Sequence, residues 1–376
     1  MSLYTRTLII GAGPAGLAVA GRLRKMGEDF EVVEQSNKIA FSWQNHYDRL
    51  CLHTVKQLSH LPHLPFPEDY PLYVPRLDLV RYYENYAKEF NIKPHFNESV
   101  ISIEKIDDQW ITTTKTGKSY TSENVVIGTG VNRVPHYPTW EGQDSFKGEI
   151  VHSRDYKNPK PFLGKKVLVV GMGNTGSELA LDLAEHNVDS TISVRSPITI
   201  VPRDLNGRPV QLTAKTLAKL PFGLGDWLGT MIRKVVFRGL DKFGLPLSKV
   251  HPAVQLRETG KTPIIDLGTV DYIRAGKIQV VRNFSKFTPN GVVLETGEEK
   301  NFDAVILSTG YRAKIDDFIK DTNGLLDRFN LPKKEVMDDE AHKGMYFIGF
   351  DNYKLGGLLG TIFSGSEIIA DHIKTK

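Results

Sequence analysis

Two glycine-rich turns are the parts of this chain whose residue types and spacing are best suited to chemistry. The first is Gly11-Ala12-Gly13-Pro14-Ala15-Gly16, which follows the apolar run Leu8–Ile10. The second is Gly171-Met172-Gly173-Asn174-Thr175-Gly176, which follows Val167–Val170. Glycines at this spacing allow a tight turn between a strand and a helix, so that backbone N–H groups and the helix N-terminus can approach a pyrophosphate. We refer to these turns as the first and second glycine fingerprints.

The residue that would contact the ribose has opposite charge in the two fingerprints. Glu34 lies 23 residues after Gly11, and Arg195 lies 24 residues after Gly171, so both are expected at the end of the second strand of a β-α-β unit. A carboxylate there accepts a hydrogen bond from a free ribose 2′-hydroxyl, whereas a guanidinium suits a 2′-phosphate. The first site is therefore predicted to bind FAD and the second NADPH. A solvated surface charge is the alternative interpretation of Arg195.

The apolar patterns predict an α/β fold with two dinucleotide-binding Rossmann-type domains. Residues 5–35 and the residues from Lys165 onward each read as strand, helix, strand, and two such distant units cannot share one cofactor. The last third of the chain adds two short strands and a closing helix. We therefore expect an FAD domain formed by residues 1–158 and 304–376. Residues 159–303 would form an inserted NADPH domain, with a helical segment at about 205–250.

The composition argues against several classes of protein. The 376 residues carry a net charge of +4 with basic and acidic residues interspersed, so a nucleic-acid partner is not expected. The single cysteine, Cys51, provides no dithiol to receive electrons from a flavin. There is no secretory signal and no run of about 18 apolar residues, so the cytoplasm is the expected location. No metal-ligand cluster is apparent, and the oligomeric state stays open, a homodimer included.

Residues 224–243 have the period of an amphipathic helix. Apolar residues recur at intervals of three and four, with basic residues between them. The favoured interpretation is a helix of the core or between domains. The alternative is a basic amphipathic helix that touches a membrane surface or lines the substrate entrance.

A linker motif before the second fingerprint identifies a family resemblance. Phe146, Gly148, His152 and Tyr156 match the Phe-x-Gly-x-x-x-His-x-x-x-Tyr/Phe signature of class B flavin-containing monooxygenases. Ser308-Thr309-Gly310-Tyr311 and Ser42-Trp43-Gln44 also resemble motifs of this family. We interpret His152 as a hydrogen-bonded hinge residue rather than a catalyst.

Further segments resemble the plant YUCCA branch of the family, which oxidatively decarboxylates indole-3-pyruvate. They are Tyr47–His53, Lys56-Gln57 and Gly260–Gly268. His53 stands where the sulfur- and nitrogen-oxygenating members have an active-site asparagine, and the YUCCA branch also has histidine there. The resemblance therefore puts simple sulfide or amine oxidation in doubt.

The resemblance implies a reaction in which NADPH reduces FAD and O2 adds to the reduced flavin at C4a. The resulting (hydro)peroxyflavin would oxygenate a 2-oxo acid, another carbonyl, or a soft sulfur or nitrogen nucleophile. His53 is the candidate catalytic residue, because a histidine titrates near neutrality and can donate a proton to the peroxide or leave it anionic. Packing against the cofactor is the alternative role of His53.

Two other functions remain open at this point. One is an NADPH:acceptor reductase or oxidase without oxygen insertion, and the other is a redox-sensing flavoprotein with a partner docked on residues 224–243. The fingerprints and the resemblance assign cofactor binding to Gly11, Gly13, Pro14, Ala15, Gly16, Glu34, Gln35, Trp43, Arg49, His53, Thr54, Gly130, Gly171, Gly173, Asn174, Thr175, Gly176, Arg195, Ser196, Gly310, Tyr311 and Gly349.

Overall fold

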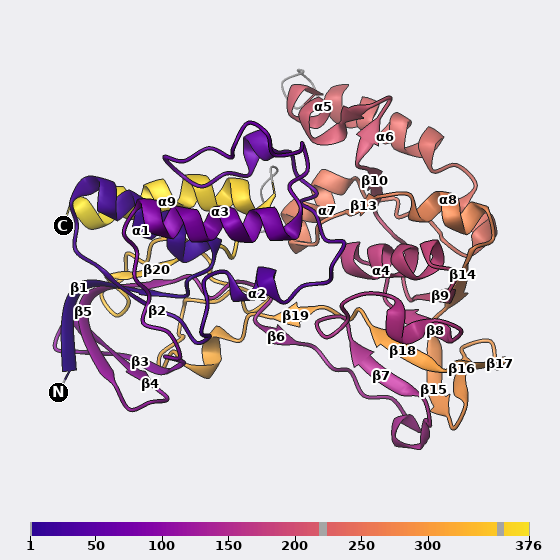
Figure 1. The fold of residues 1–376 in the computed structure, drawn as a ribbon, viewed down its shortest axis with the longest axis horizontal. Coiled ribbons are helices and arrows are strands. Elements are labelled where there is room, and N and C mark those ends of the chain that lie inside the picture. The colour runs from indigo at the N-terminus through magenta and orange to yellow at the C-terminus, as the bar shows by residue number, and fades with distance from the viewer. Residues whose placement is uncertain (1, 218–223, 352–356, 376) are drawn as a thin grey trace. The chain divides into compact units, whose positions relative to one another are not determined.

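Two sheets, each carrying a glycine fingerprint at the end of a central strand, organise the chain (Figure 1). The computed structural model describes residues 2–217, 224–351 and 357–375. The chain divides into unit 1, which is Met1–Asn45, Thr54–Val134 and Tyr311–Lys376, and unit 2, which is His46–His53 and Pro135–Gly310. Residues 46–53 thus belong to unit 2 although the residues on either side belong to unit 1. We call these eight residues the crossing segment.

Unit 1 is built on a six-stranded sheet in the order β2-β1-β5-β4-β3, with β20 paired to β5. β1, β2, β5 and β20 run parallel, whereas β3, β4 and β5 form an antiparallel meander. The parallel strands are buried on both faces, which explains continuous apolar runs such as Leu8–Ile10. The bounds are β1 Ser2–Ile10, β2 Glu31–Val33, β3 Val100–Ile106, β4 Gln109–Thr114, β5 Ser119–Ile127 and β20 Met345–Phe347.

Helix α1 (Pro14–Met26) packs against α3 (Arg76–Glu89) and the C-terminal α9 (Leu358–Lys374). The approach of α1 to α3 requires glycine at position 21, because an added Cβ would lie 2.0 Å from the Tyr86 hydroxyl oxygen. On the other side, the buried Arg22 Nε donates to Ser366 Oγ at 3.0 Å. The end of the chain is therefore fixed to the helix that follows the first fingerprint.

Unit 2 repeats this plan with a five-stranded parallel sheet in the order β14-β9-β8-β18-β7. Helix α4 begins within the second fingerprint, and α8 packs against this helix. A separate three-stranded antiparallel sheet, β15-β16-β17, precedes β18. The bounds are β7 Glu149–His152, β8 Lys166–Val170, α4 Asn174–Glu185, β9 Asp189–Val194, α8 Thr269–Arg274, β14 Ile278–Arg282, β15 Phe284–Thr288, β16 Gly291–Leu294, β17 Glu299–Asn301 and β18 Ala304–Leu307.

The two units share their local geometry but take one strand from different places in the chain. Gly11 N donates to Val33 O at 2.8 Å, and Gly171 N donates to Ser193 O at 3.0 Å. In unit 1 the strand on the far side of β5 is β20, which comes near the C-terminus. In unit 2 the equivalent strand, β7, precedes the fingerprint.

Shorter elements connect these parts. The helices are α2 Phe41–Gln44, α5 Val210–Leu217, α6 Leu224–Val236 and α7 Pro252–Thr259, and the strands are β6 Val134–Pro135, β10 Ile200–Pro202, β11 Asp204–Leu205, β12 Arg208–Pro209, β13 Ile264–Asp266 and β19 Tyr311–Arg312. Single 3-10 turns are η1 Lys56–Leu58, η2 Gln143–Ser145, η3 Lys160–Phe162, η5 Leu240–Phe243 and η6 Ile315–Asp317.

The division into units differs from the boundaries at residues 158 and 303 that the sequence suggested. Unit 2 takes in residues 135–310 and the crossing segment. The reason is the pairing of β18 with both β7 and β8, which brings residues on each side of the expected insertion into one sheet. A fingerprint marks the first strand of a Rossmann sheet but carries no information about which distant strands complete it.

The amphipathic segment, residues 224–243, forms α6 and the turn η5, whereas residues 218–223 of the expected helical segment at about 205–250 lie outside the described residues. Its inner side contributes Phe237 to the core, and the buried Arg233 donates to the carbonyl of Ser248. On the outer side Trp227 is 59% exposed and Val235 is 71% exposed, so this side is not part of a core. Among the described residues, no helix has the length and apolar character needed to cross a membrane.

Gly176→Ala should destabilise unit 2 by about 2–3 kcal/mol, because the added Cβ would lie 1.9 Å from Gly171 O. Gly173→Ala is the matched variant: its Cβ would meet no atom within 4 Å. We expect it to keep the wild-type melting temperature but to weaken dinucleotide binding, since the methyl group would fill space over the start of α4. Thermal unfolding and NADPH titration measure the two effects. Equal melting temperatures for Gly176→Ala and the wild type would contradict this account.

Candidate functional site

The first fingerprint leaves the start of α1 open for a phosphate. Pro14 occupies the first helical position, where the absence of an N–H is tolerated, and Gly13 is the N-cap. A Cβ added at Gly13 would meet nothing within 4 Å, whereas one at Gly16 would lie 1.9 Å from Gly11 O. The loop is therefore closed toward the protein and open in front of the helix, which fits a bound pyrophosphate.

Glu34 is buried directly after β2, and both of its carboxylate oxygens accept backbone hydrogen bonds. Ala12 N donates to Oε2 at 2.8 Å, and Ser36 N donates to Oε1 at 2.9 Å. The carboxylate thus holds the fingerprint loop in place. Because each oxygen keeps a further lone pair, it can also accept from a ribose hydroxyl, as the sequence predicted.

A cavity of about 590 Å³ opens in unit 1 next to Glu34. Gln35, Phe41, Asn97 and Lys115 are among the residues that line it. A volume of this order can hold a nucleoside, with the Phe41 ring as an apolar surface and the polar side chains around it. The cavity therefore fits the adenosine end of FAD, close to the predicted residue Gln35.

The second fingerprint has the same open geometry at the start of α4, where Gly173 is the N-cap. Its neighbour Asn174 uses its side chain within the protein: Nδ2 donates to Pro263 O at 3.2 Å, and Oδ1 accepts from Ile265 N at 2.7 Å. These bonds hold the side chain toward Pro263 and Ile265, so a phosphate would meet the backbone of the fingerprint. The side chain instead fixes β13, which belongs to the Gly260–Gly268 segment.

Arg195 directly follows β9, as Glu34 follows β2. Its side chain is exposed, and it makes no hydrogen bond or ion pair with another residue that the structure describes. Ser196 beside it is also exposed. This placement leaves the guanidinium available for an anionic ligand such as a 2′-phosphate.

Two buried hydroxyls near the fingerprints have no hydrogen-bond partner in the described part of the chain. They are Thr129 Oγ1, after β5, and Ser308 Oγ, after β18. Gly130 and Gly310 follow them, and a Cβ added at either glycine would meet nothing within 4 Å. Unpartnered buried hydroxyls beside open backbone are the expected setting for a polar ligand. They support binding of a nucleotide in each unit.

The signature histidine has a structural role. His152 is buried at the end of β7, where Nδ1 accepts from Arg154 N at 3.1 Å and Nε2 lies 3.2 Å from Gly310 O. Because a carbonyl only accepts, the proton resides on Nε2. Burial lowers the pKa of His152, which favours the neutral ring. Both nitrogens are occupied within unit 2, in keeping with the predicted hinge role.

The remaining signature positions also serve packing in unit 2. The Tyr156 hydroxyl donates to Asp182 Oδ2 on α4 at 2.7 Å, with both residues buried. Burial raises the pKa of Asp182, and the hydrogen bond from Tyr156 opposes this shift. At Gly148 an added Cβ would lie 2.5 Å from both Asp303 O and the Phe146 ring. The signature residues therefore pack the linker within unit 2 and do not form a group of catalytic residues.

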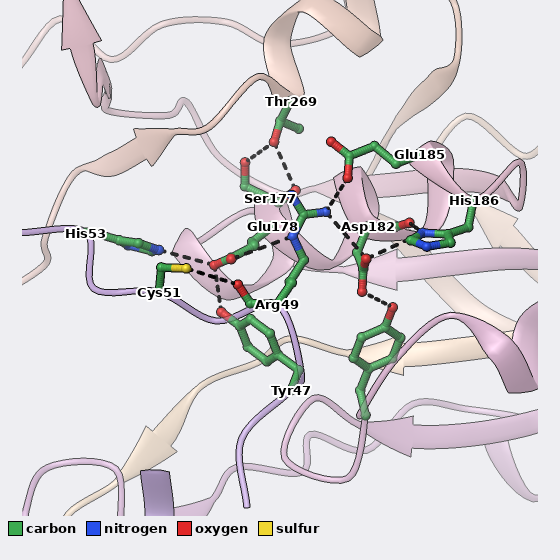
Figure 2. A network of polar contacts seen from close by, with 11 residues as sticks. Tyr47, Arg49, Cys51, His53, Ser177, Glu178, Asp182, Glu185, His186 and Thr269 are labelled. Carbon is green, nitrogen blue, oxygen red and sulfur yellow. Dashed lines mark hydrogen bonds and ion pairs between the residues drawn. The ribbon is translucent and has the colours of Figure 1, made fainter. Parts of the chain in front are cut away.

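A network of ion pairs and hydrogen bonds holds the crossing segment against α4 (Figure 2). Arg49 Nη1 lies 2.7 Å from Glu185 Oε2 and 3.4 Å from Asp182 Oδ1, and its Nε lies 3.8 Å from Glu178 Oε1. Burial alone would lower the pKa of Arg49, but the carboxylates of Glu185 and Asp182 raise it. The sequence assigned Arg49 to cofactor binding, and the structure engages its guanidinium with three acidic residues of α4.

His53 ends the crossing segment and contacts the same helix. Its Nε2 lies 3.1 Å from Glu178 Oε2, and this oxygen also accepts from the Tyr47 hydroxyl at 2.7 Å. The predicted catalytic residue is therefore positioned by unit 2, which contains the second fingerprint.

Most other predicted residues lie in unit 1. Trp43 is half-buried in α2, and the Thr54 hydroxyl lies 2.7 Å from Ser59 Oγ. Gly349 follows β20 beside the first fingerprint, since an added Cβ there would lie 3.1 Å from Ala15 Cβ. Tyr311 is half-buried in β19, at the return of the chain to unit 1.

Comparison with known proteins agrees with this geometry. The family model described as Flavin-binding monooxygenase-like matches residues 5–358. The chain belongs to this family.

Relatives within the flavin-binding monooxygenase family cover nearly the whole chain. A probable indole-3-pyruvate monooxygenase YUCCA3 of Arabidopsis thaliana is 36% identical over 98% of this chain and 87% of its own length. The indole-3-pyruvate monooxygenase YUCCA1 of Oryza sativa subsp. japonica is 35% identical over 97% and 90%. The structure of a flavin-containing monooxygenase from Stenotrophomonas maltophilia superposes with a TM-score of 0.75 at 19% identity, covering 100% of this chain and 99% of that one.

Family membership confirms several predictions from the sequence. The chain is an oxidoreductase, a flavin monooxygenase that uses FAD and NADPH, and it has the two Rossmann-type domains expected for them. The YUCCA-like resemblance of the chain is confirmed as well.

Glu178 and Asp182 are the residues of this monooxygenase that the sequence analysis missed. Both are buried, and both receive side chains from distant parts of unit 2. The available signal was their spacing. Glu178 and Asp182 are four residues apart, and the residues between them are apolar, so both carboxylates lie on the buried face of one helix.

Arg195→Ala should raise the KM for NADPH by about tenfold to a hundredfold, because a hydrogen bond to a charged group contributes about 1.5–3 kcal/mol. The KM for NADH should change little, since NADH lacks the 2′-phosphate. Steady-state reduction with the two cofactors provides the comparison. Equal losses for both would remove Arg195 from the phosphate site.

Proposed function

We propose that this monooxygenase acts on a 2-oxo acid and converts it to the shortened carboxylic acid. The overall reaction would consume the 2-oxo acid, O2, NADPH and a proton, and would yield the carboxylic acid, CO2, water and NADP⁺. Indole-3-pyruvate is the first substrate to test, because relatives at 35–36% identity are named for it. Other carbonyls and soft sulfur or nitrogen nucleophiles are the competing substrates.

The observation that carries this proposal is the contact of two of the YUCCA-like segments, Tyr47–His53 and Gly260–Gly268, with one helix. Tyr47 and His53 of the crossing segment bond to Glu178 of α4. From the second segment, Ile265 N bonds to Asn174 at the start of the same helix. The sequence features that distinguish this branch therefore surround the helix that follows the second fingerprint, and we take them to form one functional unit.

FAD and NADPH are bound by different residues in this proposal. When bound, NADPH supplies the hydride that reduces FAD, and the reduced flavin activates O2. The N–H groups at the start of α1 and Glu34 hold FAD, and those at the start of α4 hold the pyrophosphate of NADPH. Arg195 holds the 2′-phosphate. The open space over Gly13 and Gly173 supports both assignments.

His53 is the group we expect to act beside the flavin. When Nε2 carries a proton, it donates this proton to Glu178 in a hydrogen bond, so Nδ1 is the nitrogen that can accept a proton or a hydrogen bond. In this role His53 controls the protonation of reduced oxygen and thereby the balance between substrate oxygenation and release of hydrogen peroxide.

An NADPH:acceptor reductase is the function that the test must separate from this one. Electron transfer to a dithiol of this chain is excluded, because Cys51 is its only cysteine. Measuring NADPH, O2, peroxide and product with indole-3-pyruvate decides between the two. A monooxygenase forms indole-3-acetate and CO2 in one-to-one ratio with NADPH consumed. NADPH oxidation that yields only peroxide with every 2-oxo acid, ketone and sulfide tested would overturn the proposal.

His53→Asn should lower product formation by at least about tenfold and raise the peroxide released per NADPH, because the protonation control is lost. The rate of anaerobic flavin reduction by NADPH should stay within about twofold, since hydride transfer needs no group from His53. His186→Asn is the matched control, because His186 caps the C-terminal end of α4 and contacts Asp182 rather than Glu178. Unchanged coupling in His53→Asn would exclude the role.

A further inference from the structure

Glu178 is an acidic residue with almost no access to solvent: its side chain is 3% exposed. A carboxylate in such surroundings is costly unless hydrogen-bond donors surround it. The donors that the structure provides all come from the crossing segment. They are the Tyr47 hydroxyl at 2.7 Å and His53 Nε2 at 3.1 Å; Arg49 Nε adds an ion pair with the other oxygen at 3.8 Å (Figure 2).

The contact with Glu178 restricts the imidazole of His53 chemically. A carboxylate only accepts hydrogen bonds, so the nitrogen that faces it must carry a proton. Neutral His53 is then held as the Nε2–H tautomer, with Nδ1 unprotonated. The second donor, Tyr47, fixes the carboxylate itself, so that both the tautomer and the ring orientation are determined.

We infer that Glu178 is a positioning residue that holds His53 in the Nε2–H tautomer and ties it to α4. This inference rests on the proposed role of His53 in oxygenation, because a fixed tautomer matters to the reaction only if His53 takes part. Glu178 itself contacts neither cofactor nor substrate in this account. It acts through the imidazole, as a buried carboxylate can orient a catalytic histidine.

The position of Glu178 in α4 adds a link to the nucleotide site. Glu178 lies one turn after Asn174, which is the first residue of α4 and also belongs to the second fingerprint. A single rigid helix therefore carries both the N–H groups proposed to bind the NADPH pyrophosphate and the carboxylate that orients His53. Nucleotide binding and the placement of His53 thereby share one element.

Asp182, one turn further along α4, provides the matched control. It is buried like Glu178 and also pairs with Arg49, but its hydroxyl partner is Tyr156 and it does not contact His53. Asp182→Asn thus removes a buried charge from the same network without changing the partner of the imidazole. A purely structural role of Glu178 predicts similar behaviour for Glu178→Gln and Asp182→Asn.

The direct test reads the tautomer in the oxidised, FAD-bound protein labelled with ¹⁵N-histidine. Long-range ¹H–¹⁵N spectra report which ring nitrogen carries the proton, and the His53 signals are those absent from His53→Asn. We expect Nε2 to be protonated in the wild type and in Asp182→Asn. In Glu178→Gln the amide can donate as well as accept, so the Nε2 signal should move toward the value of an unprotonated or averaged nitrogen.

Two results would overturn the inference: an Nε2 signal in Glu178→Gln that matches the wild type, or an Nε2 that is already unprotonated or averaged in the wild type. If Glu178→Gln does not fold, as judged by flavin content and thermal unfolding, Tyr47→Phe replaces it. That variant keeps the carboxylate but removes its second donor, and it should shift the His53 signals in the same direction by a smaller amount. Unchanged His53 signals in Tyr47→Phe would then count against the inference.

Kinetics connect the tautomer to function and separate the two proposals. Glu178→Gln should raise the peroxide released per NADPH and lower kcat for product by about tenfold. The KM of Glu178→Gln for NADPH should stay within about twofold of the wild type. Asp182→Asn should show neither the rise in peroxide per NADPH nor the fall in kcat. If the tautomer shifts but the wild type forms no oxygenated product, the proposed function fails, and Glu178 still sets the tautomer of His53 but has no role in oxygenation. If the wild type is coupled but the tautomer does not shift, only the positioning role fails.

Discussion

The close approach of a strand end to a helix start, which only glycine permits, is the constraint on which the rest of the structure depends. At Gly16 and Gly176 an added Cβ would lie 1.9 Å from a carbonyl oxygen of the same turn, whereas the space over Gly13 and Gly173 is empty. The turn is therefore packed on its inner side and vacant in front of the helix. In unit 1 the Ala12 N–H donates to Glu34, and in unit 2 the Gly171 N–H donates to the carbonyl of Ser193. In each unit the glycine turn therefore also positions the second strand of its Rossmann sheet.

Local patterns in the sequence were sufficient for the parts of the molecule that depend on neighbouring residues. The strands before the fingerprints, helices α1 and α4, and the positions of Glu34 and Arg195 all follow from periodicity and spacing. Pairing over long distances was not predictable in this way. The membership of β7 and β18 in one sheet, and the transfer of the crossing segment to unit 2, depend on contacts between residues more than a hundred positions apart. The burial of Glu178 was missed for the same reason, since its partners come from Tyr47 and His53.

Helix α4 connects features that appeared separate in the sequence. The family signature reaches it through Tyr156, the crossing segment through Arg49 and His53, and the Gly260–Gly268 segment through Asn174. Its acidic residues account for most of these contacts. They also explain why a guanidinium and two tyrosine hydroxyls converge on a helix whose other buried side chains, apart from Ser177, are apolar. Most of the motifs that characterise this monooxygenase thus contain residues that contact α4.

The origin of β20 and α9 at the end of the chain has a consequence for the order of assembly. Every described strand of unit 2 precedes β20 in the chain and is therefore synthesised before it, so unit 2 can close first while unit 1 still lacks its last strand. Gly349, which lies beside Ala15 of the first fingerprint, and Ser366, which receives Arg22 of α1, belong to that late portion. The nascent protein can therefore complete its NADPH-binding half before the last strand of its flavin-binding half is synthesised.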